Sequence, residues 1–497
     1  MEQKISRPIA ITILLNSALA FYIFYLLANH RNIDGDEGLY LEAARLVSHG
    51  KKLYLDFFFQ QMPLTPYLYS IWMKVFGFNL FSPRYLSVLL TSLSGASVLI
   101  YAAYKTRNVL VVNLLALAFF ANGLVLAWAP VIKTHPLTMF ALTGASLFLL
   151  YWRNTKKIWS LILASFVLGL GINGRLTLGP FAIVFLIFIY LNSKEDPWKN
   201  LALFIAVMAF TSLPTFYYVF SDPAEFFRFN LKYHTEVYPG VVGMDRRAQT
   251  LGNLIGRAQF ILLLAASQLA FISEMKTGIL KFFKTDSGFL FIILGVFFLI
   301  HISSAEPYTQ YFVAMVPLFL MFLAPYLEKI VTFKLRFAVP ALGAFFLIYL
   351  SDARASMNFE IASMMSNRPE WSIKNVLAVA QKAKKIMLPG DTCVAWWPGY
   401  AFLAGCDTVP GMENHMRTYA IDRMPEETVR KYKMLPDSEL LNDIKFKKYR
   451  IVIDGVYHNF SPYYYEIRDQ LDENYTARGE GVKTRNSDRF PASFDKN

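Results

Sequence analysis

The chain has 497 residues, of which 55% are hydrophobic, 16% aromatic and only 17% charged, and its mean hydropathy is +0.35. Soluble globular proteins rarely reach these values, because their surfaces need more charged and polar side chains. The net charge of +13 would suit a nucleic-acid-binding protein, but the cations gather in short connections between apolar runs. That placement is typical of membrane topology, so the composition predicts a polytopic membrane protein without a nucleic-acid partner.

Apolar runs recur along the first 350 positions, each close to the ~20 residues that cross a bilayer. The stretch NSALA, residues 16–20, imitates a signal-peptidase site. The apolar run continues through Leu27, however, so we expect this segment to remain as an anchor. We predict about eleven transmembrane helices, at residues 8–28, 84–104, 108–128, 137–152, 158–174, 176–192, 201–220, 256–273, 288–302, 309–327 and 337–350.

The distribution of positive charge predicts the orientation of these helices. Short connections on one side carry about fifteen Lys and Arg residues, whereas those on the other side carry about two, Lys133 and Arg175. The positive-inside rule therefore places the N-terminus in the cytoplasm. An odd number of spans then places residues 30–83, 221–255 and 351–497 outside. We expect a multi-pass protein of the cytoplasmic (inner) membrane with these segments on the extracytoplasmic, or periplasmic, face.

We predict a mainly α fold with two domains: a helical membrane domain at residues 1–350 and a smaller extracytoplasmic α/β domain at residues 351–497. In the second domain, DTCVAWW and YRIVIDGV are short β-branched and aromatic runs typical of strands, and PDSELLNDIKF has helical spacing. The chain's two cysteines, Cys393 and Cys406, both fall in this domain. An oxidising compartment permits a disulfide between them, and a pair of buried thiols is equally compatible with the sequence.

Three acids, Asp34, Asp36 and Glu37, stand within four positions directly after the first apolar segment. One explanation is helix capping, since Asp34 and Glu37 form an acidic version of the capping box and acids suit a helix's first turn. That explanation gives no role to Asp36. If Asp36 is itself the N-cap, it gives no role to Asp34 instead. The competing explanation is a catalytic carboxylate, because ionisable groups at a membrane face are costly unless they are solvated or used.

The predicted spans carry no Asp or Glu in their interiors. Ion-coupled transporters usually place an ionisable group near the bilayer midplane, so this pattern disfavours a pump or a symporter.

The segment DEGLYLEAARLVSHGKKLYLDFFFQQMPLTPYLYSIWMKVFG, residues 36–77, resembles the first external loop of the GT-C membrane glycosyltransferases. The resemblance is to bacterial relatives of protein O-mannosyltransferases and of the aminoarabinose transferases that modify lipid A. Looser resemblance extends through THPLTMFALTGASLFLLYWR, GLGINGR and EPYTQYFVAMVPLFLM. In the first loop the matching positions are Asp36, Glu37, Tyr40, Ala44, Gly50, Tyr54, Asp56, Pro63 and Gly77.

The resemblance implies an enzyme that takes a sugar from a polyprenyl-phosphate donor and transfers it, with inversion, to a hydroxyl of an envelope acceptor. The acceptor would be lipid A or another glycolipid, a polysaccharide, or a protein. Asp36 matches the family's base, which would remove the proton of the acceptor hydroxyl. Glu37 is the second catalytic candidate, as a neighbour that orients the acceptor, and its alternative is the helix cap.

A leaving phosphate needs cations from outer span ends or loops, preferably Arg with its bidentate geometry. The candidates are Lys133, Arg175, Arg228, Lys232, Arg246, Arg247 and Arg257. Each alone is more often a solvated or headgroup-contacting residue. The family often has Lys at the position of Arg175, and commonly a Lys before the loop proline where this chain has Gln60, Gln61 and Met62. The full set of predicted substrate-binding residues is Tyr40, Tyr54, Gln61, Lys133, His135, Arg175, His234, Glu236, Arg246, His301, Glu306 and Tyr308.

We expect no required cofactor. A divalent metal held by His234, Glu236 and another residue is the alternative, since His and carboxylate suit zinc or manganese, although the spacing matches no recognised metal signature. Two other functions compete with the enzyme: a transporter or flippase of lipid-linked sugars, and a non-catalytic partner in envelope assembly. The expected partners of the enzyme are the lipid-linked donor, the acceptor and the bilayer.

Overall fold

The computed structural model describes residues 5–193, 195–237, 243–275, 278–304, 306–332, 338–362, 368–456, 463–479 and 481–486. Contacts within this part of the chain divide it into two compact units. Unit 1 lies within residues 1–29, 85–217 and 240–363, and unit 2 lies within residues 30–84, 218–239 and 364–497. The predicted domains followed the chain with one boundary at residue 350, whereas these units interleave along it.

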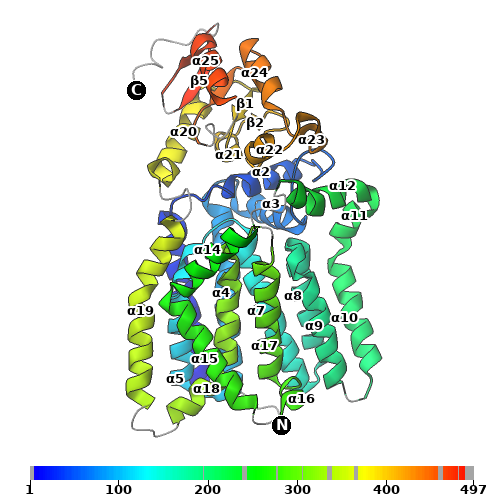
Figure 1. Ribbon diagram of the computed structural model, residues 1–497, viewed down its shortest axis with the longest axis vertical. Coiled ribbons are helices and arrows are strands. Elements are labelled where there is room, and N and C mark those ends of the chain that lie inside the picture. Colours follow the sequence, from blue (N-terminus) through cyan, green and yellow to red (C-terminus); the bar gives the residue numbers. More distant parts are fainter. Residues whose placement is uncertain are drawn as a thin grey trace. The chain divides into compact units, whose positions relative to one another are not determined.

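Unit 1 is built almost entirely of helices, many of them running side by side (Figure 1). Every predicted span falls on one or two helices. Their bounds are α1 (Arg7–His30), α4 (Phe81–Thr106), α5 (Val109–Phe120), α6 (Gly123–Trp128), α7 (Thr134–Thr155), α8 (Ile158–Gly174), η1 (Leu176–Leu178), α9 (Gly179–Asn192), α10 (Pro197–Thr211), α11 (Leu213–Ser221), α14 (Gly243–Ile255), α15 (Ala258–Met275), α16 (Ile279–Phe282), α17 (Asp286–Ile302), η3 (Thr309–Ala314), α18 (Met315–Thr332) and α19 (Ala338–Ala362).

Fewer helices than predicted have the length and composition of a membrane span. In the described part of the chain, three qualify: Arg7–His30, Phe81–Thr106 and Thr309–Thr332. The number is five if each of two bent pairs counts as one span, Pro197–Thr211 with Leu213–Ser221 and Asp245–Ile255 with Ala258–Glu274. Four other apolar helices have only 10–17 residues. The predicted count of eleven is therefore not confirmed.

Local breaks account for part of this difference. The predicted span at residues 108–128 is interrupted at Asn122, whose side chain caps α6 by accepting hydrogen bonds from the amides of Leu124 and Val125.

Small residues allow α8 and α7 to pack closely: a Cβ added at Gly171 of α8 would lie 2.4 Å from the Cβ of Ala141 on α7. Such small-residue contacts are common between membrane helices. The motif GLGINGR therefore brings the end of α8 close to α7.

Unit 2 combines short helices with a five-stranded sheet in the order β2-β1-β3-β5-β4. β1 pairs in parallel with β2 and β3, whereas β5 pairs antiparallel with β3 and β4. The strands and helix predicted for the C-terminal part lie where expected, as β1, β3 and α24. The bounds are α2 (Glu37–Ser48), α3 (Leu64–Phe76), α12 (Pro223–Phe227), η2 (Arg228–Lys232), α13 (Tyr233–Val237), η5 (Pro369–Trp371), α20 (Ile373–Ile386), β1 (Thr392–Ala395), α21 (Pro398–Ala404), β2 (Asp407–Thr408), α22 (Arg417–Arg423), α23 (Glu426–Lys431), α24 (Asp437–Lys445), β3 (Ile451–Ile453), α25 (Tyr464–Asn474), β4 (Tyr475–Ala477) and β5 (Val482–Arg485).

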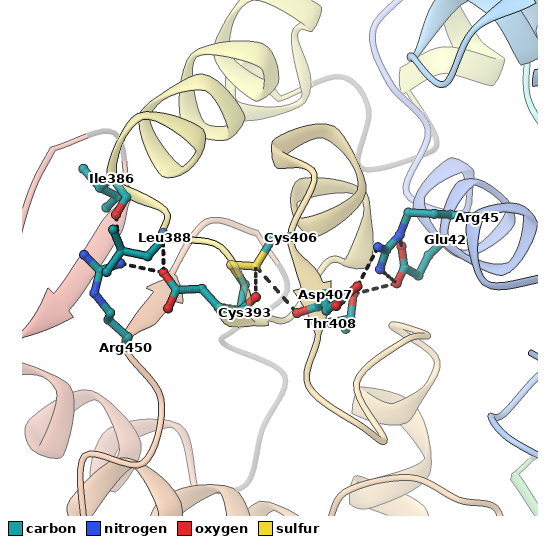
Figure 2. The surroundings of a disulfide bond; sticks show 10 residues. Glu42, Arg45, Ile386, Leu388, Cys393, Cys406, Asp407, Thr408 and Arg450 are labelled. Atoms are coloured by element: carbon teal, nitrogen blue, oxygen red, sulfur yellow. Dashed lines mark hydrogen bonds and ion pairs between the residues drawn. A yellow bond between two sulfur atoms is a disulfide. The ribbon is translucent and has the colours of Figure 1, made fainter. Parts of the chain in front are cut away.

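A disulfide joins Cys393 in β1 to Cys406, which directly precedes β2 (Figure 2). Of the two alternatives left open by the sequence, the structure contains the disulfide rather than two thiols. Beside it, Asp407 forms an ion pair of 3.0 Å with Arg45 of α2. Thr408 donates a hydrogen bond of 2.7 Å to Glu42, one turn before Arg45. The C-terminal sheet is thereby tied to the helix that follows the acidic motif.

Candidate active site

The predicted site residues divide equally between the two units. Unit 2 contains Asp36, Glu37, Tyr40, Tyr54, Gln61, His234 and Glu236. Unit 1 contains Lys133, His135, Arg175, Arg246, His301, Glu306 and Tyr308.

Asp36 directly precedes α2, and its carboxylate is partly exposed, at 29% of the side chain. Among the described residues its side chain does not cap the helix. Instead, one carboxylate oxygen lies 3.2 Å from Nε2 of His415. An ionised carboxylate can only accept hydrogen bonds, so the imidazole Nε2–H is the donor in this pair. The carboxylate of Asp36 is thus held by a ring and still reaches the surface.

Asp34 and Glu37 both support this position, but not as a capping box. Asp34 accepts a hydrogen bond of 3.1 Å from the backbone amide of Asp36, which fixes the turn before the helix. The carboxylate of Glu37 is fully buried and pairs with Arg84, at 2.7 Å from Nη2. Arg84 also donates to the backbone oxygen of Arg31 at 2.9 Å. The capping role considered for Glu37 is replaced by a buried ion pair that anchors the loop.

Gln61 is held by two of the predicted tyrosines. The hydroxyl of Tyr40 donates to Oε1 of Gln61 at 2.6 Å, and the hydroxyl of Tyr54 donates to its backbone oxygen at 2.6 Å. Tyr54 adopts a φ of +66°, an unusual value for a residue with a side chain. Its ring packs edge-on against Tyr218 and Phe226, which stabilises that conformation. Both predicted tyrosines therefore shape the loop around Gln61.

Gln60 connects the loop to two other segments of unit 2. Its backbone oxygen lies 3.0 Å from Nε2 of His234, which is on α13. Its side-chain oxygen accepts a hydrogen bond of 2.8 Å from Asn414. Gln60, the first of the three residues before the loop proline, thus has a buried side chain engaged in internal contacts.

His234 and Glu236 lie on the same short helix but contact different partners. Glu236 accepts a short hydrogen bond from Tyr432 and pairs with Lys232 at 3.1 Å. Partial burial disfavours its charged form, but the bonds from Tyr432 and Lys232, with the charges of Lys232 and Arg228, lower the pKa of Glu236. In the described ranges no group of three or more His, Cys, Asp or Glu side chains is placed to hold a metal ion. His234 and Glu236 contribute to the packing of unit 2.

In unit 1, two cations and a histidine gather between α7, α8 and η3. Lys133 is 4% exposed, and its Nζ lies 3.2 Å from Oε1 of Gln310 and 4.8 Å from the ring centroid of Trp128. Arg175 contacts Nδ1 of His135 at 3.1 Å. The motif GLGINGR ends at this arginine, so the close packing of α8 on α7 explains why Arg175 reaches His135.

Tyr311 is at the centre of this group. The guanidinium of Arg175 lies over its ring at 4.5 Å, and the rings of His135 and His301 each lie 5.8 Å from it. We call Lys133, His135, Arg175, His301 and Tyr311 the Tyr311 cluster. Cation–π contacts hold positive charge beside aromatic faces in a partly desolvated setting. The cluster is therefore suited to binding an anion.

His301 has one ring nitrogen that is satisfied and one that is not. Its ring stacks on Phe297 at 4.0 Å, and its Nδ1 lies 3.0 Å from the backbone oxygen of Phe297. Nδ1 therefore carries the proton, which leaves Nε2 as an acceptor in the neutral ring. Within the described part of the chain this buried Nε2 has no hydrogen-bond partner. A buried polar atom of this kind is expected to pair with a ligand or with water.

The remaining predicted residues of unit 1 extend the cluster. Tyr308 lies 5.6 Å from Tyr311, its hydroxyl donates to Glu306 at 2.6 Å, and the guanidinium of Arg246 lies 4.6 Å over its ring. All seven predicted residues of unit 1 thus belong to one chain of contacts. Four other candidate cations have internal partners: Arg228 with Glu225, Lys232 with Glu236, Arg247 with the backbone of Ile302, and Arg257 with Glu360.

The sequence did not single out several residues that the structure brings to these sites. His415, Asn414 and Arg84 contact the acidic loop, and Tyr311 organises the cluster in unit 1. A polar group following Gly411 in GMENH was the one signal for His415 and Asn414. The contact between His415 and Asp36 joins distant parts of the chain, and no spacing rule in the sequence predicts such a contact.

Comparisons with known proteins agree on the fold. Residues 60–217 match the family model described as dolichyl-phosphate-mannose-protein mannosyltransferase. No curated protein matches the sequence. Among solved structures, ArnT from Cupriavidus metallidurans bound to undecaprenyl phosphate has a TM-score of 0.66 and 14% identity, over 95% of this chain and 97% of that one.

The archaeal oligosaccharyltransferase AglB from Archaeoglobus fulgidus, in complex with an inhibitory peptide and a dolichol-phosphate, has a TM-score of 0.55 and 12% identity. That match covers 97% of this chain and 75% of AglB. The chain therefore has the fold of these GT-C enzymes, as the resemblance predicts. The family model covers only the last part of the first-loop segment, from residue 60 onward.

Proposed function

We propose that this protein is an inverting glycosyltransferase that moves a sugar from a polyprenyl-phosphate donor to a hydroxyl of an envelope acceptor. The observation that carries the proposal is the Tyr311 cluster of unit 1, in which Lys133, His135 and His301 are buried and Arg175 is half-buried. Unit 2 separately contains Asp36, a partly exposed carboxylate bonded to His415. The structural matches support the donor class, since the compared ArnT and AglB structures contain undecaprenyl phosphate and a dolichol-phosphate.

The Tyr311 cluster would bind the donor's phosphate. Lys133 and Arg175 supply two positive charges, and the planar guanidinium can contact two phosphate oxygens at once. Their contacts with Trp128 and Tyr311 hold the charges in place before the ligand arrives. As the glycosidic bond breaks, negative charge grows on the phosphate, and fixed cations in a water-poor setting stabilise it more strongly than water does.

His301 would recognise the sugar of the donor. Its Nε2 is buried, accepts hydrogen bonds and has no partner among the described residues. A sugar hydroxyl can donate to it, which removes the free-energy cost of an unsatisfied buried acceptor.

Asp36 would act as the general base. The acceptor oxygen attacks the anomeric carbon on the face opposite the phosphate, and the bond between that carbon and the phosphate oxygen breaks. The bonding electrons leave with the phosphate, and the hydroxyl proton passes to Asp36. A single displacement inverts the anomeric centre. Glu37 supports this base through the Arg84 anchor, and Tyr40, Tyr54, Gln61 and His234 shape the same loop.

The positive-inside pattern supports transfer on the extracytoplasmic face of the cytoplasmic membrane. Lipid A or another glycolipid, a polysaccharide and protein Ser or Thr all offer the hydroxyl that the chemistry requires.

Transfer assays with the purified, lipid-reconstituted protein test the proposal. Radiolabelled polyprenyl-phosphate sugars are offered with extracted envelope acceptors, and donor binding is measured separately. The wild-type protein and an Asp422→Asn control, altered at an exposed helix position, should transfer label. Asp36→Asn should bind donor without transfer, and Arg175→Gln should bind it weakly. Translocation of donor without transfer by the wild-type protein would establish the flippase alternative instead.

A further inference from the structure

The acidic loop is held by a second, distant segment of unit 2 that includes Trp397 and His415. The indole nitrogen of Trp397 donates a hydrogen bond of 2.7 Å to the backbone oxygen of Gly35. The packing beside this bond is close, because a Cβ added at Gly38 would lie 2.5 Å from the same nitrogen. The segment after β1 therefore contacts the chain on both sides of Asp36.

The turn after Gly411 adds two side-chain contacts to the loop. His415 is 1% exposed, and its Nε2 lies 3.2 Å from Oδ1 of Asp36. The adjacent Asn414 donates to Oε1 of Gln60 at 2.8 Å. Two neighbouring residues thus reach the two parts of the loop that the sequence singled out, the acidic motif and the segment before the proline.

The turn itself is rigidly held. Oδ1 of Asn414 accepts the amide of Met416 at 3.0 Å, and its backbone oxygen accepts the amide of Arg417 at 3.1 Å. The buried side chain of Arg417 forms an ion pair with Asp437 and a hydrogen bond with the backbone of Leu435. His415 therefore stands on a support whose own side chains are fixed, as a precise positioning group requires.

We propose that His415 is a positioning residue for the base, and that its Nε2–H fixes the direction of the Asp36 carboxylate toward the acceptor hydroxyl. This inference rests on the proposed function. A carboxylate can rotate about two side-chain bonds, and a base works efficiently only when its oxygen is directed at the proton it removes. The bond from His415 restricts that rotation. The C-terminal segment is then a part of the catalytic site rather than only a surface for the acceptor.

Two substitutions separate positioning from packing. His415→Gln retains an N–H close to the position of Nε2, whereas His415→Leu retains a similar volume without a donor. His415→Leu should lower kcat roughly 10- to 100-fold, with KM for the donor unchanged, because the base is still present but misdirected. His415→Gln should recover most of that loss. His49→Leu, the same change at an exposed histidine directly after α2, is the matched control and should transfer at the wild-type rate.

A second measurement does not depend on turnover. Thermal unfolding of the wild-type, Asp36→Asn, His415→Leu and doubly substituted proteins should show non-additive changes, because His415→Leu removes the N–H that bonds to Asp36. Wild-type kcat in a folded His415→Leu protein would overturn the inference, and so would equal losses in the Leu and Gln variants. Additive Tm changes would overturn it as well. Absence of transfer by the wild-type protein with every donor would contradict the proposed function, while the thermal cycle would still decide whether the pair is coupled.

Discussion

The three acids at residues 34–37 have three different surroundings, although they stand side by side in the sequence. Asp34 accepts a backbone amide, Glu37 is buried against Arg84, and Asp36 is partly exposed and bonded to His415. A group that must exchange a proton with a substrate has to be accessible, and of the three only Asp36 combines access with a fixed direction. The different roles that we propose for them therefore rest on their partners rather than on their charge.

Replacing Asp36 and Asp34 separately tests this division. Asp36→Asn should abolish transfer while the protein stays folded and binds donor, because an amide cannot accept the proton. Asp34→Asn keeps an oxygen acceptor for the amide of Asp36, so it should retain most of the transfer and lose on the order of 1 kcal/mol of stability. Transfer rates and thermal unfolding of both variants measure whether each acid contributes to transfer or to stability. The opposite pattern would show that the roles are assigned wrongly.

Replacing His301 tests the proposed contact with the sugar. His301→Phe keeps an aromatic ring stacked on Phe297 but removes Nε2. Loss of one hydrogen bond to a neutral group should raise KM for the donor roughly 2- to 10-fold with little change in kcat. Phe297→Leu is the control, because it changes the stacking partner and leaves Nε2 in place. An unchanged KM in His301→Phe would exclude this nitrogen from donor binding.

At the scale of single elements, α2 is fixed at both ends within unit 2. Its first turn packs on Trp397, and its middle and last turn are tied to β2 through Glu42 with Thr408 and Arg45 with Asp407. The sequence predicted this helix from its apolar spacing, because that pattern is local. It did not predict the helix's partners, since Arg45 and Asp407, for example, are separated by 362 residues.

Gly38 should not tolerate a side chain. A Cβ there would lie 2.5 Å from Trp397 and 2.9 Å from the backbone nitrogen of Gly399. Gly38→Ala should therefore move Trp397, lower stability by about 1–3 kcal/mol and reduce transfer. Gly252→Ala is the matched control, because a Cβ at this helical position meets nothing within 4 Å. Equal Tm and transfer in the two variants would contradict the observed packing.

The disulfide should stabilise the sheet next to the anchor of α2. It closes a loop with a sequence separation of 13. Loops of this size give about 3 kcal/mol in the chain-entropy account. The Cys393→Ala/Cys406→Ala protein should therefore unfold at a lower temperature than the wild-type protein. A reductant should lower the Tm of the wild-type protein and leave that of the double variant unchanged. An equal response to reductant would show that the disulfide has no stabilising role.

At the scale of the whole molecule, hydropathy predicted where helices occur, whereas the two units of the structure depend on contacts that hydropathy does not describe. Apolar runs identify helices because a segment that crosses a bilayer must be apolar along a continuous stretch of the sequence. The assignment of residues 30–84, 218–239 and 364–497 to one unit depends on contacts between segments separated by many helices. The predicted outer loop at residues 221–255 illustrates the limit: its first half belongs to unit 2, whereas α14 belongs to unit 1.

For the candidate site too, the sequence indicated residues that form local patterns and missed those that depend on distant contacts. The family resemblance led to Asp36, and charge and polarity led to the residues around Tyr311. Arg84, His415 and Asn414 were missed because an isolated polar residue in a sequence has no pattern until the fold supplies its partner.

The orientation predicted from charge can be tested with reporter fusions. Alkaline phosphatase, which folds only after export, should be active when fused to the C-terminus. It should be inactive when fused after Arg107, which follows α4 and Lys105 of its last turn, in a connection that is predicted to be cytoplasmic. An inactive C-terminal fusion with stable protein would reverse the assigned face.

The three-segment composition of unit 2 also has a consequence for the timing of biosynthesis. A ribosome makes residues 30–84 first and reaches residues 364–497 only after all the helices between them. Asp36 is therefore synthesised long before His415, the residue that we propose directs it. The nascent chain has the proposed base without its partner, and interrupted translation leaves it in that state. Each molecule would become competent for transfer only when synthesis of its last segment is complete, so that incomplete products do not consume the lipid-linked donor.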